Sequence, residues 1–341
     1  MIKSLLYSRH NILPALLPLK ASRAITGQRL VMLIYHTVND TAPDHIRHLY
    51  QPRTLKIFTE DMEFLLKHYE PIDLFRLKEI VNNREKPRRN LFFVSFDDGL
   101  SEFYFPAAPL LEKMGIPATC FLNTAFVDNR DMFYRYKVSV LIEAIQKHKE
   151  RKEFWQEFHA LKEKHDIPQG YYRNVLLGLN YCHLPFIEEA AQLVRLDFTD
   201  YLKSRQPYMT DEQIRELVRK GFTFGGHGVN HADFNLLTEE EKISQAFQST
   251  KEVAERFGLP YRVFSFPFTD FGIEKSFFNA IYANDQIELS FGTAGLKKDS
   301  EYRNLQRIPI EESGLSAERR LKADYFYYLL KGLIGQNVIV R

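Results

Sequence analysis

Short runs of apolar residues recur along the chain, and most of them are unbroken rather than alternating with polar residues. Strands that are buried on both faces of a parallel sheet have this pattern. Helical patterns separate most of the runs, and this alternation predicts an α/β fold of parallel βα units that close into a barrel. The predicted strands are Leu30–His36, Leu91–Phe96, Ala118–Leu122, Phe222–Gly226, Tyr261–Phe266, Ile287–Gly292, Leu305–Ile310 and, as a weaker one, Pro71–Leu74.

Two of the helical patterns carry clear start signals. Thr210 and Gln213 fit a capping box, and so do Thr238 and Glu241, which precede a long amphipathic segment. A further helix is predicted near the end of the chain, over Ala317–Leu330.

One stretch interrupts the alternation, because no convincing strand pattern occurs between about Asp128 and Gln206. Helical segments rich in charged and aromatic residues fill it: Lys137–Lys149, Lys152–His165, Gly170–Leu179 and Pro185–Lys203. We therefore expect an N-terminal extension over residues 1–29, a first barrel part over 30–127, a helical insertion over 128–206 and a second barrel part over 207–341.

Composition narrows the classes of partner. The net charge of +2 and the lack of a basic stripe predict no nucleic-acid partner. No window has the roughly 18 apolar residues of a membrane span, although peripheral contact with a membrane stays open. Lys3 and Arg9 precede an apolar stretch that two prolines interrupt, unlike the clean core of a signal peptide. With only two cysteines, a cytoplasmic location is expected ahead of a secreted or periplasmic one.

Residues suited to catalysis follow the predicted strands, at the ends where βα loops meet. Asp97 and Asp98 follow one strand directly, and His227 and His231 follow another. Two imidazoles and one carboxylate are a common catalytic site for a divalent metal ion, and the second carboxylate can then act as general base. A metal ion lowers the pKa of a bound water to about 7 and polarises a substrate carbonyl. The two pairs therefore predict a hydrolytic metal site.

Each pair also has a purely structural interpretation. An Asp-Asp-Gly sequence can form an ordinary turn with a helix cap, and two histidines four residues apart can be unrelated to each other. Their joint position after buried strands favours the metal site. His36 ends a third predicted strand and can be either a rim histidine or a substrate contact, while Pro267 and Phe268 end a fourth.

These motifs resemble those of the polysaccharide deacetylases of carbohydrate esterase family 4. Ser95–Gly99 matches the family's Thr/Ser-Phe-Asp-Asp-Gly motif, and His227–His231 matches its His-Ser/Thr-x-x-His motif. Tyr35–Val38 is similar to a Tyr-His-x-Val motif, and Ser265–Phe271 is similar to a Tyr-Pro-Tyr-Gly strand end. The resemblance implies a distorted (β/α)7 barrel that removes acetyl groups from a sugar.

The resemblance also implies a role for each matched residue. Asp97 would be the general base, while Asp98, His227 and His231 would bind the metal ion, most often Zn²⁺. A backbone amide near Phe268 would stabilise the oxyanion. An acetylated sugar or glycan precursor would be the substrate, with the acetyl group on nitrogen or oxygen.

The chain departs from the family pattern at three points. Gly228 stands where the family has Ser or Thr. No arginine stands at the strand end over residues 265–268, where many members have one that orients the base, and Arg307 is the candidate replacement. No histidine follows His231, although the family's usual general acid is a histidine near the last strands, and His36 is a weak candidate for this role.

We expect a divalent-metal-dependent sugar deacetylase, because the base and all three ligands are present. The missing late histidine supports a second hypothesis, a catalytically impaired barrel that binds carbohydrate. A third is a related hydrolase that cleaves a non-peptide C–N bond in a non-sugar substrate. The insertion can be a lid or a membrane-proximal platform, with Phe133, Tyr134, Arg135 and Tyr136 near the site, or a packing element on the barrel flank.

Overall fold

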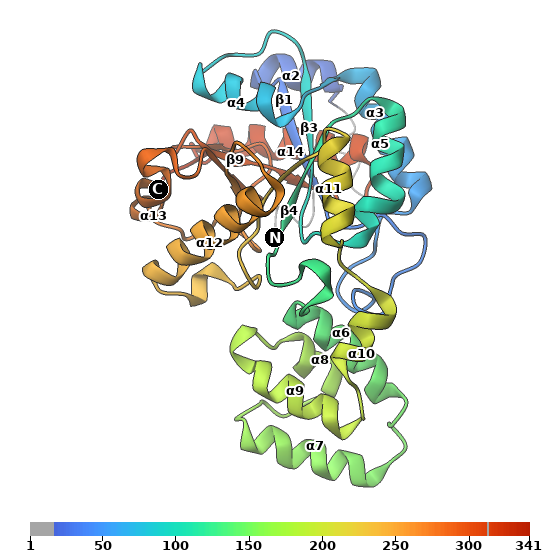
Figure 1. Ribbon diagram of the computed structural model, residues 1–341. Coiled ribbons are helices and arrows are strands. Elements are labelled where there is room, and N and C mark those ends of the chain that lie inside the picture. Colours follow the sequence, from blue (N-terminus) through green and yellow to red (C-terminus); the bar gives the residue numbers. More distant parts are fainter. Residues whose placement is uncertain (1–16, 312–313) are drawn as a thin grey trace.

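A parallel sheet forms the centre of the protein in the computed structural model, which describes residues 17–311 and 314–341 (Figure 1). Eight strands follow one another in the order β10-β1-β3-β4-β5-β6-β7-β9, and β2 pairs with β3 as a ninth. Every pairing in this sheet is parallel. The strands are β1 Leu30–Tyr35, β2 Glu70–Pro71, β3 Leu91–Phe96, β4 Ala118–Leu122, β5 Thr223–Gly226, β6 Val263–Ser265, β7 Leu289–Gly292, β9 Asn304–Gln306 and β10 Ile308–Pro309.

The sheet is nearly closed, because its two edge strands follow each other directly in the sequence. Only Arg307 separates β9 from β10. The predicted single strand Leu305–Ile310 is therefore wrong: its first half pairs with β7 and its second half with β1. If β9 and β10 are counted as one broken strand, the path has seven members with helices around them, and the distorted (β/α)7 barrel is confirmed.

The pairing of β1 with β3 determines where the first two site segments lie. The two strands pair in register over their whole length, up to Tyr35 opposite Phe96. All residues of β3 are buried, as its unbroken apolar run predicts. Since the strands are parallel and in register, the residues that follow them, His36 and Asp97, leave the sheet at the same edge.

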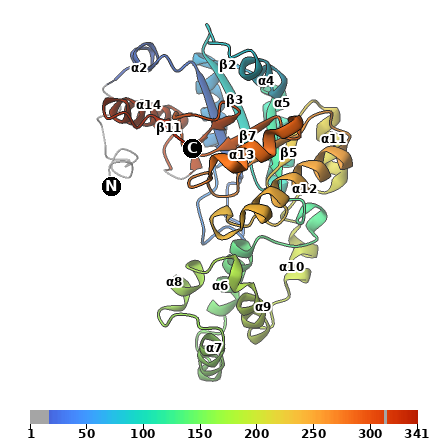
Figure 2. The ribbon, with the colours of Figure 1, turned by 90° about the vertical axis from the view of Figure 1, so that its left-hand side faces the viewer.

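Helices cover the outside of the barrel (Figures 1 and 2). They are α2 Leu19–Thr26, α3 Leu55–His68, α4 Leu74–Asn82, α5 Ala108–Met114, α11 Asp211–Arg219, α12 Glu239–Phe257, α13 Lys275–Tyr282 and α14 Ala317–Leu333. Both predicted capping boxes are present, at the starts of α11 and α12. The weak strand Pro71–Leu74 is wrong over its second half, because the Asp73 side chain accepts a hydrogen bond from the N–H of Arg76 and begins α4 there.

The segment between β4 and β5 forms a helical lobe below the barrel in Figure 1. Its helices are α6 Tyr134–Gln146, α7 Lys152–Lys164, α8 Tyr172–Leu177, α9 Leu184–Leu193 and α10 Phe198–Arg205. They share a hydrophobic cluster that includes Phe186. The predicted single helix Pro185–Lys203 is wrong, because Asp197 accepts hydrogen bonds from the N–H groups of Thr199 and Asp200 and thereby begins a new helix.

One small sheet lies outside the barrel and has no counterpart among the predicted strands. It consists of β8 Lys298–Asp299 and β11 Val338–Ile339, which pair in parallel. Residues 1–16 of the predicted N-terminal extension lie outside the described residues, and the rest of the extension contains α2. Among the described residues, no helix combines the length and the apolar character that crossing a bilayer requires.

The end of β5 lies so close to α12 that it leaves no room for a side chain. A Cβ atom at Gly226 would lie 2.7 Å from Ser249 Oγ and 2.8 Å from the backbone nitrogen of Thr250. Gly226→Ala should therefore push β5 away from α12 and lower the free energy of unfolding by about 1–3 kcal/mol, measured by urea denaturation.

Gly332→Ala is the matched control for this substitution. The nearest atom to its added Cβ would be Asn337 Nδ2 at 3.5 Å, which is an ordinary contact. Since Gly332 lies in α14, the change should leave the free energy of unfolding unchanged or raise it by up to about 1 kcal/mol. Equal losses of stability in the two variants would contradict the close packing of β5 on α12.

Candidate active site

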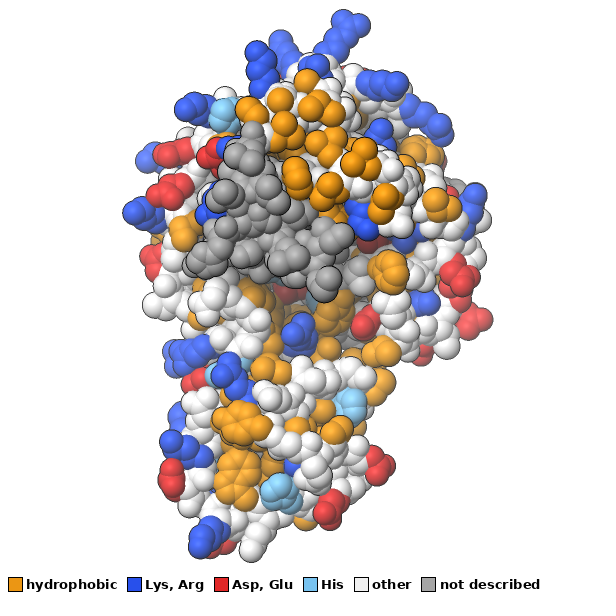
Figure 3. All heavy atoms as spheres, turned by 180° about the vertical axis from the view of Figure 1, so that it is seen from behind, with side chains coloured by type: hydrophobic (Ala, Val, Ile, Leu, Met, Phe, Trp, Pro, Cys, Tyr) orange, Lys and Arg blue, Asp and Glu red, His pale blue; other side chains and the backbone are white. Residues whose placement is uncertain are grey.

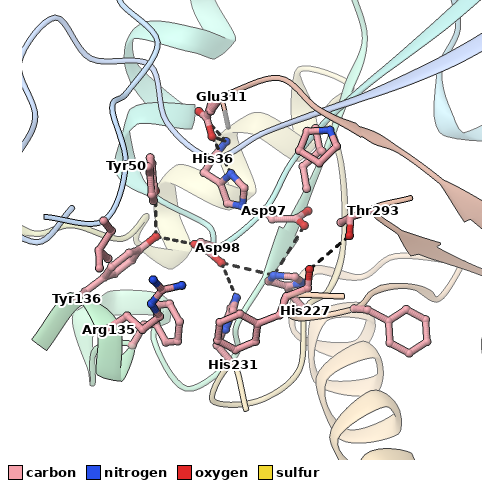
Figure 4. Close-up of a pocket in the computed structure, with 16 residues that line it drawn as sticks. His36, Tyr50, Asp97, Asp98, Arg135, Tyr136, His227, His231, Thr293 and Glu311 are labelled. Atoms are coloured by element: carbon pink, nitrogen blue, oxygen red, sulfur yellow. Dashed lines mark hydrogen bonds and ion pairs between the residues drawn. The ribbon is translucent and has the colours of Figure 1, made fainter. Parts of the chain in front are cut away.

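A cavity of about 240 Å³ lies between the carboxyl ends of the barrel strands and the helical lobe (Figures 3 and 4). Two of the eight predicted site residues do not line this cavity: Arg307 is bonded to Asp97, and Pro267 lies next to Gly228. The parallel sheet thus brings together residues from widely separated parts of the sequence. Six of the eight predicted site residues line the cavity: His36, Asp97, Asp98, His227, His231 and Phe268.

Asp98, His227 and His231 form a buried group whose ligand atoms all lie within 4.8 Å of one another. Asp98 Oδ1 is 3.2 Å from His231 Nε2 and 3.5 Å from His227 Nε2. Ligands that bind one zinc ion tetrahedrally at about 2.1 Å lie roughly 3.4 Å apart. The spacing of the three predicted ligands therefore suits a single metal ion.

The hydrogen bonds around these side chains also favour a cation. His227 Nδ1 lies 2.9 Å from the carbonyl oxygen of Ser265, so Nδ1 carries the proton and the lone pair of Nε2 faces the site. Asp98 Oδ1 is buried and has no hydrogen-bond partner among the described residues. A carboxylate oxygen and an imidazole lone pair repel each other, and a metal ion between them would satisfy both. Burial lowers the pKa of His231, which favours the neutral imidazole that binds metals.

Two amide side chains form hydrogen bonds with the histidine loop. They take over the role of the hydroxyl group that Gly228 lacks. Gln245 Oε1, on α12, accepts a hydrogen bond of 2.7 Å from the N–H of Val229. Asn123 Nδ2 donates to the carbonyl oxygen of His227. Gly228 has a φ of 75°, a conformation that favours glycine. The departure at Gly228 therefore leaves the loop with other hydrogen bonds.

Asp97 is held by the buried arginine at the seam of the barrel. Arg307 Nη1 and Nη2 each lie 2.8 Å from one oxygen of Asp97, which makes a bidentate ion pair. Ser265 Oγ donates to Asp97 Oδ2 at 3.0 Å. Burial alone would raise the pKa of Asp97, but the charge and the hydrogen bonds of Arg307 outweigh it and lower the pKa. Asp97 is therefore an ionised carboxylate near neutral pH.

The second oxygen of Asp98 is bonded to the helical lobe. The Tyr136 hydroxyl, on α6, donates to Asp98 Oδ2 at 2.5 Å and lies 3.3 Å from the Tyr50 hydroxyl (Figure 4). Burial raises the pKa of Tyr136 well above its usual value, so the hydroxyl stays protonated and can donate. This bond orients the carboxylate with Oδ1 toward the two histidines. The lobe thus contributes directly to the site.

His36 forms an ion pair with a residue that the sequence analysis did not select. His36 Nδ1 lies 2.7 Å from Glu311 Oε2, and Glu311 also accepts from the N–H groups of His36 and Thr37. Burial by itself would lower the pKa of His36, but the hydrogen bond and the charge of Glu311 outweigh it and raise the pKa to about 9. His36 is therefore protonated at neutral pH. Glu311 follows β10 closely. Its position just after a strand is the same signal that pointed to His36.

Three site residues have left-handed backbone conformations. Their φ angles are 71° at Asp98, 55° at His231 and 58° at Phe268. Such angles are uncommon for residues other than glycine, and they cluster at functional sites. The Phe268 ring lies 4.7 Å from the His231 ring and 5.8 Å from the Phe133 ring, between centroids. Phe268 therefore connects the histidine loop to the helical lobe.

The comparison with protein families agrees with this geometry. A family model described as polysaccharide deacetylase matches residues 84–170 and 187–280, which are more than half of the chain and include the candidate base and all three candidate ligands. The chain belongs to the polysaccharide deacetylase family. This membership confirms the resemblance that the motifs indicated. A search of the curated proteins finds no match.

Solved structures of deacetylases resemble this member of the family in fold at low sequence identity. The Streptococcus pyogenes deacetylase PplD in complex with acetate is 15% identical, with a TM-score of 0.55 over 86% of this chain and 97% of that chain. IcaB from Ammonifex degensii is 17% identical, with a TM-score of 0.54 over 87% and 98% of the two chains. A de-N-acetylase from Aggregatibacter actinomycetemcomitans is 12% identical, with a TM-score of 0.50 over 86% and 99%. At these identities the similarity shows the fold alone.

Removing the Tyr136 hydroxyl tests whether the lobe supports the candidate metal site. Tyr136→Phe leaves Asp98 Oδ2 without its donor and frees the carboxylate to rotate. Metal affinity should fall by roughly 10- to 100-fold, measured by competition with a chelator.

Tyr50→Phe is the control, because it removes the neighbouring hydroxyl but keeps the bond between Tyr136 and Asp98. Its metal affinity should stay close to that of the wild type. A Tyr136→Phe variant that binds metal as tightly as the wild type would show that the bond does not orient the ligand.

Proposed function

We propose that the protein is a divalent-metal-dependent deacetylase that hydrolyses an N-acetyl or O-acetyl group on a sugar or glycan precursor. The observation that carries the proposal is an ionised base, Asp97, in the same cavity as the three candidate ligands. Asp97 Oδ2 lies 3.7 Å from His227 Nε2, so a water beside the ligands would be within reach of the base. The class of reaction is also supported by the two structural relatives described as a deacetylase with acetate and as a de-N-acetylase.

The residues around the cavity supply the groups that the reaction needs. A divalent ion, with zinc expected, would polarise the acetyl carbonyl and make the attacking water more acidic. Asp97 would accept a proton from the attacking water, because Arg307 keeps the carboxylate ionised and fixes its orientation. A backbone amide near Phe268, which lines the cavity, would donate a hydrogen bond to the oxygen that gains negative charge.

We assign the protonation of the leaving group to His36. The family's usual histidine is missing, because no histidine follows His231 in the chain. His36 lines the same cavity with a side chain that is 30% exposed, and Glu311 holds it protonated. An ionised base and a protonated acid that coexist at one pH form the pair that amide hydrolysis requires. This assignment removes the main reason to regard the barrel as catalytically impaired.

Release of acetate from N-acetylated sugars by the zinc-loaded protein tests the proposal. Asp97→Asn keeps the shape of the side chain but cannot accept a proton, so kcat should fall by about 10²- to 10⁴-fold. The zinc content of the variant should match that of the wild type, because Asp97 is not among the three ligands. The proposal fails if the wild type releases no acetate from a panel of acetylated sugars.

The same assay separates the other two hypotheses. A carbohydrate-binding barrel without turnover would bind sugars of the panel and release no acetate. A hydrolase of non-sugar C–N bonds would release product only from the non-sugar members of a wider panel. A cytoplasmic location and peripheral contact with a membrane stay predictions.

Replacing Glu311 tests His36 as the acid. Glu311→Gln removes the charge that raises the pKa of His36, while the burial that lowers it remains. His36 donates a proton only in its protonated form, so kcat falls as the pH rises through this pKa. The basic limb of the kcat profile is therefore expected at about pH 9 in the wild type and at lower pH in the variant.

Glu274→Gln is the control for the loss of one negative charge, because Glu274 is exposed and does not line the cavity. Its profile should follow that of the wild type. A Glu311→Gln profile that does the same would exclude His36 as the group that limits the rate at high pH.

A further inference from the structure

Arg135 brings a positive charge to the cavity that no described residue neutralises. It is half-buried on α6 and lines the cavity, and it has no hydrogen bond or ion pair within the part of the chain that the structure describes (Figure 4). Lys137, in the same turn, shows the contrast, because its Nζ lies 2.8 Å from Asp131 Oδ1 and 2.7 Å from Glu188 Oε1. Neighbouring carboxylates therefore compensate the charge of Lys137, whereas the charge of Arg135 stays available to a ligand.

The first turn of α6 adds to the positive potential at this wall. Phe133, Arg135 and Tyr136 all line the cavity, so the start of the helix faces it. The helix has no side-chain cap and no acidic residue in its first turn. The N-terminus of a helix carries a partial positive charge and N–H groups that bind anions. Two independent features of α6 thus favour an anion at the same place.

The other charges of the site compensate one another. The base is paired with Arg307, and His36 is paired with Glu311. The two positive charges of a divalent ion would exceed the single negative charge of Asp98 by one. Arg135 adds one further positive charge. The metal-loaded cavity would therefore be positive overall, and a neutral sugar would leave this charge uncompensated.

Nothing in the proposed reaction uses Arg135. The two oxygens of Asp98 already face Tyr136 and the histidines, and Asp97 is held by Arg307. Burying an unpaired charge costs free energy, so a ligand that pairs with this half-buried guanidinium would gain from binding there.

We infer that Arg135 and the first turn of α6 bind an anionic group, a phosphate or a carboxylate, on the acetylated sugar. The inference rests on the proposed function, because it names the substrate class of the same site. A guanidinium binds either group through two parallel hydrogen bonds. Leu49 and Phe133 are apolar residues that line the same cavity, and an ionic contact is stronger in apolar surroundings than in water. Arg135 would thus select charged over neutral acetylated sugars.

Kinetics on three probes test the inference: N-acetylglucosamine, N-acetylglucosamine 1-phosphate and N-acetylglucosaminuronic acid. We expect the wild type to favour one or both anionic probes over the neutral one in kcat/KM by about 10- to 100-fold. Arg135→Gln should lower this ratio toward one, mainly through KM, and Arg135→Lys should restore part of it. The phosphate and uronate arms show which anion the site prefers.

Titration of inorganic phosphate into the zinc-loaded protein gives a readout that does not depend on turnover. Contact of phosphate with the metal ion is common to all variants, so a difference between them reports Arg135. We expect Arg135→Gln to raise the Kd for phosphate by about 10- to 100-fold. Arg173→Gln is the matched control, because it removes an exposed arginine from α8, away from the cavity, and should leave both the ratio and the Kd unchanged.

Two results would overturn the inference: an unchanged ratio of kcat/KM in Arg135→Gln, or an unchanged Kd for phosphate. Thermal unfolding of each variant should match the wild type, since Arg135 supports no other residue of the described chain. If neither the wild type nor any variant releases acetate from any probe, the proposed function fails. The phosphate titration still decides the role of Arg135 in that case.

Discussion

The buried ion pair between Arg307 and Asp97 is the interaction on which both the barrel and the site depend. Arg307 stands where β9 passes into β10 and the sheet closes on itself, and its guanidinium also bonds the hydroxyls of Ser95 and Ser265. Its charge lies 5.2 Å from the centre of the Phe121 ring. Because both ionic groups are buried, losing one would leave the other uncompensated, at a cost of about 3–5 kcal/mol. The contact that joins the seam to β3 is therefore also the one that keeps the candidate base ionised.

The helical lobe is part of the site rather than a cover added to it. Tyr136 orients the Asp98 carboxylate, and the Phe133 ring lies 4.1 Å from the His231 ring, between centroids. α6 packs in a hydrophobic cluster that joins the lobe to barrel loops, with Ile46 and Leu100 among its members, and this packing supports the two contacts. The same turn presents Arg135 to the cavity. A lobe in this position would link the geometry of the candidate metal site to the proposed choice of substrate.

The acid and the base of the proposed reaction reach their charge states by the same physical means. Burial opposes the charged form of each side chain, and the ion-pair partner makes the largest of the contributions that outweigh burial in each case. The partners, Glu311 and Arg307, both come from the short segment that follows β7 and closes the sheet. The closing strands thus position the two groups that keep an acid protonated and a base ionised at one pH.

The sequence by itself determined most of the barrel strands, the parallel barrel and the rim where the site lies, because burial on both faces leaves unbroken apolar runs and parallel strands end at one edge. It also indicated six of the residues that line the cavity, and it indicated Arg307 as the partner of the candidate base. It did not determine the break in the last strand or the partners of Asp98 and His36. Those contacts join residues 38 and 275 positions apart, and no local pattern records which side chain will face another across the barrel. Only the tertiary structure decided which charged side chains pair and that the charge of Arg135 has no partner among the described residues. The reason is that pairing depends on distance in space and not on position along the chain.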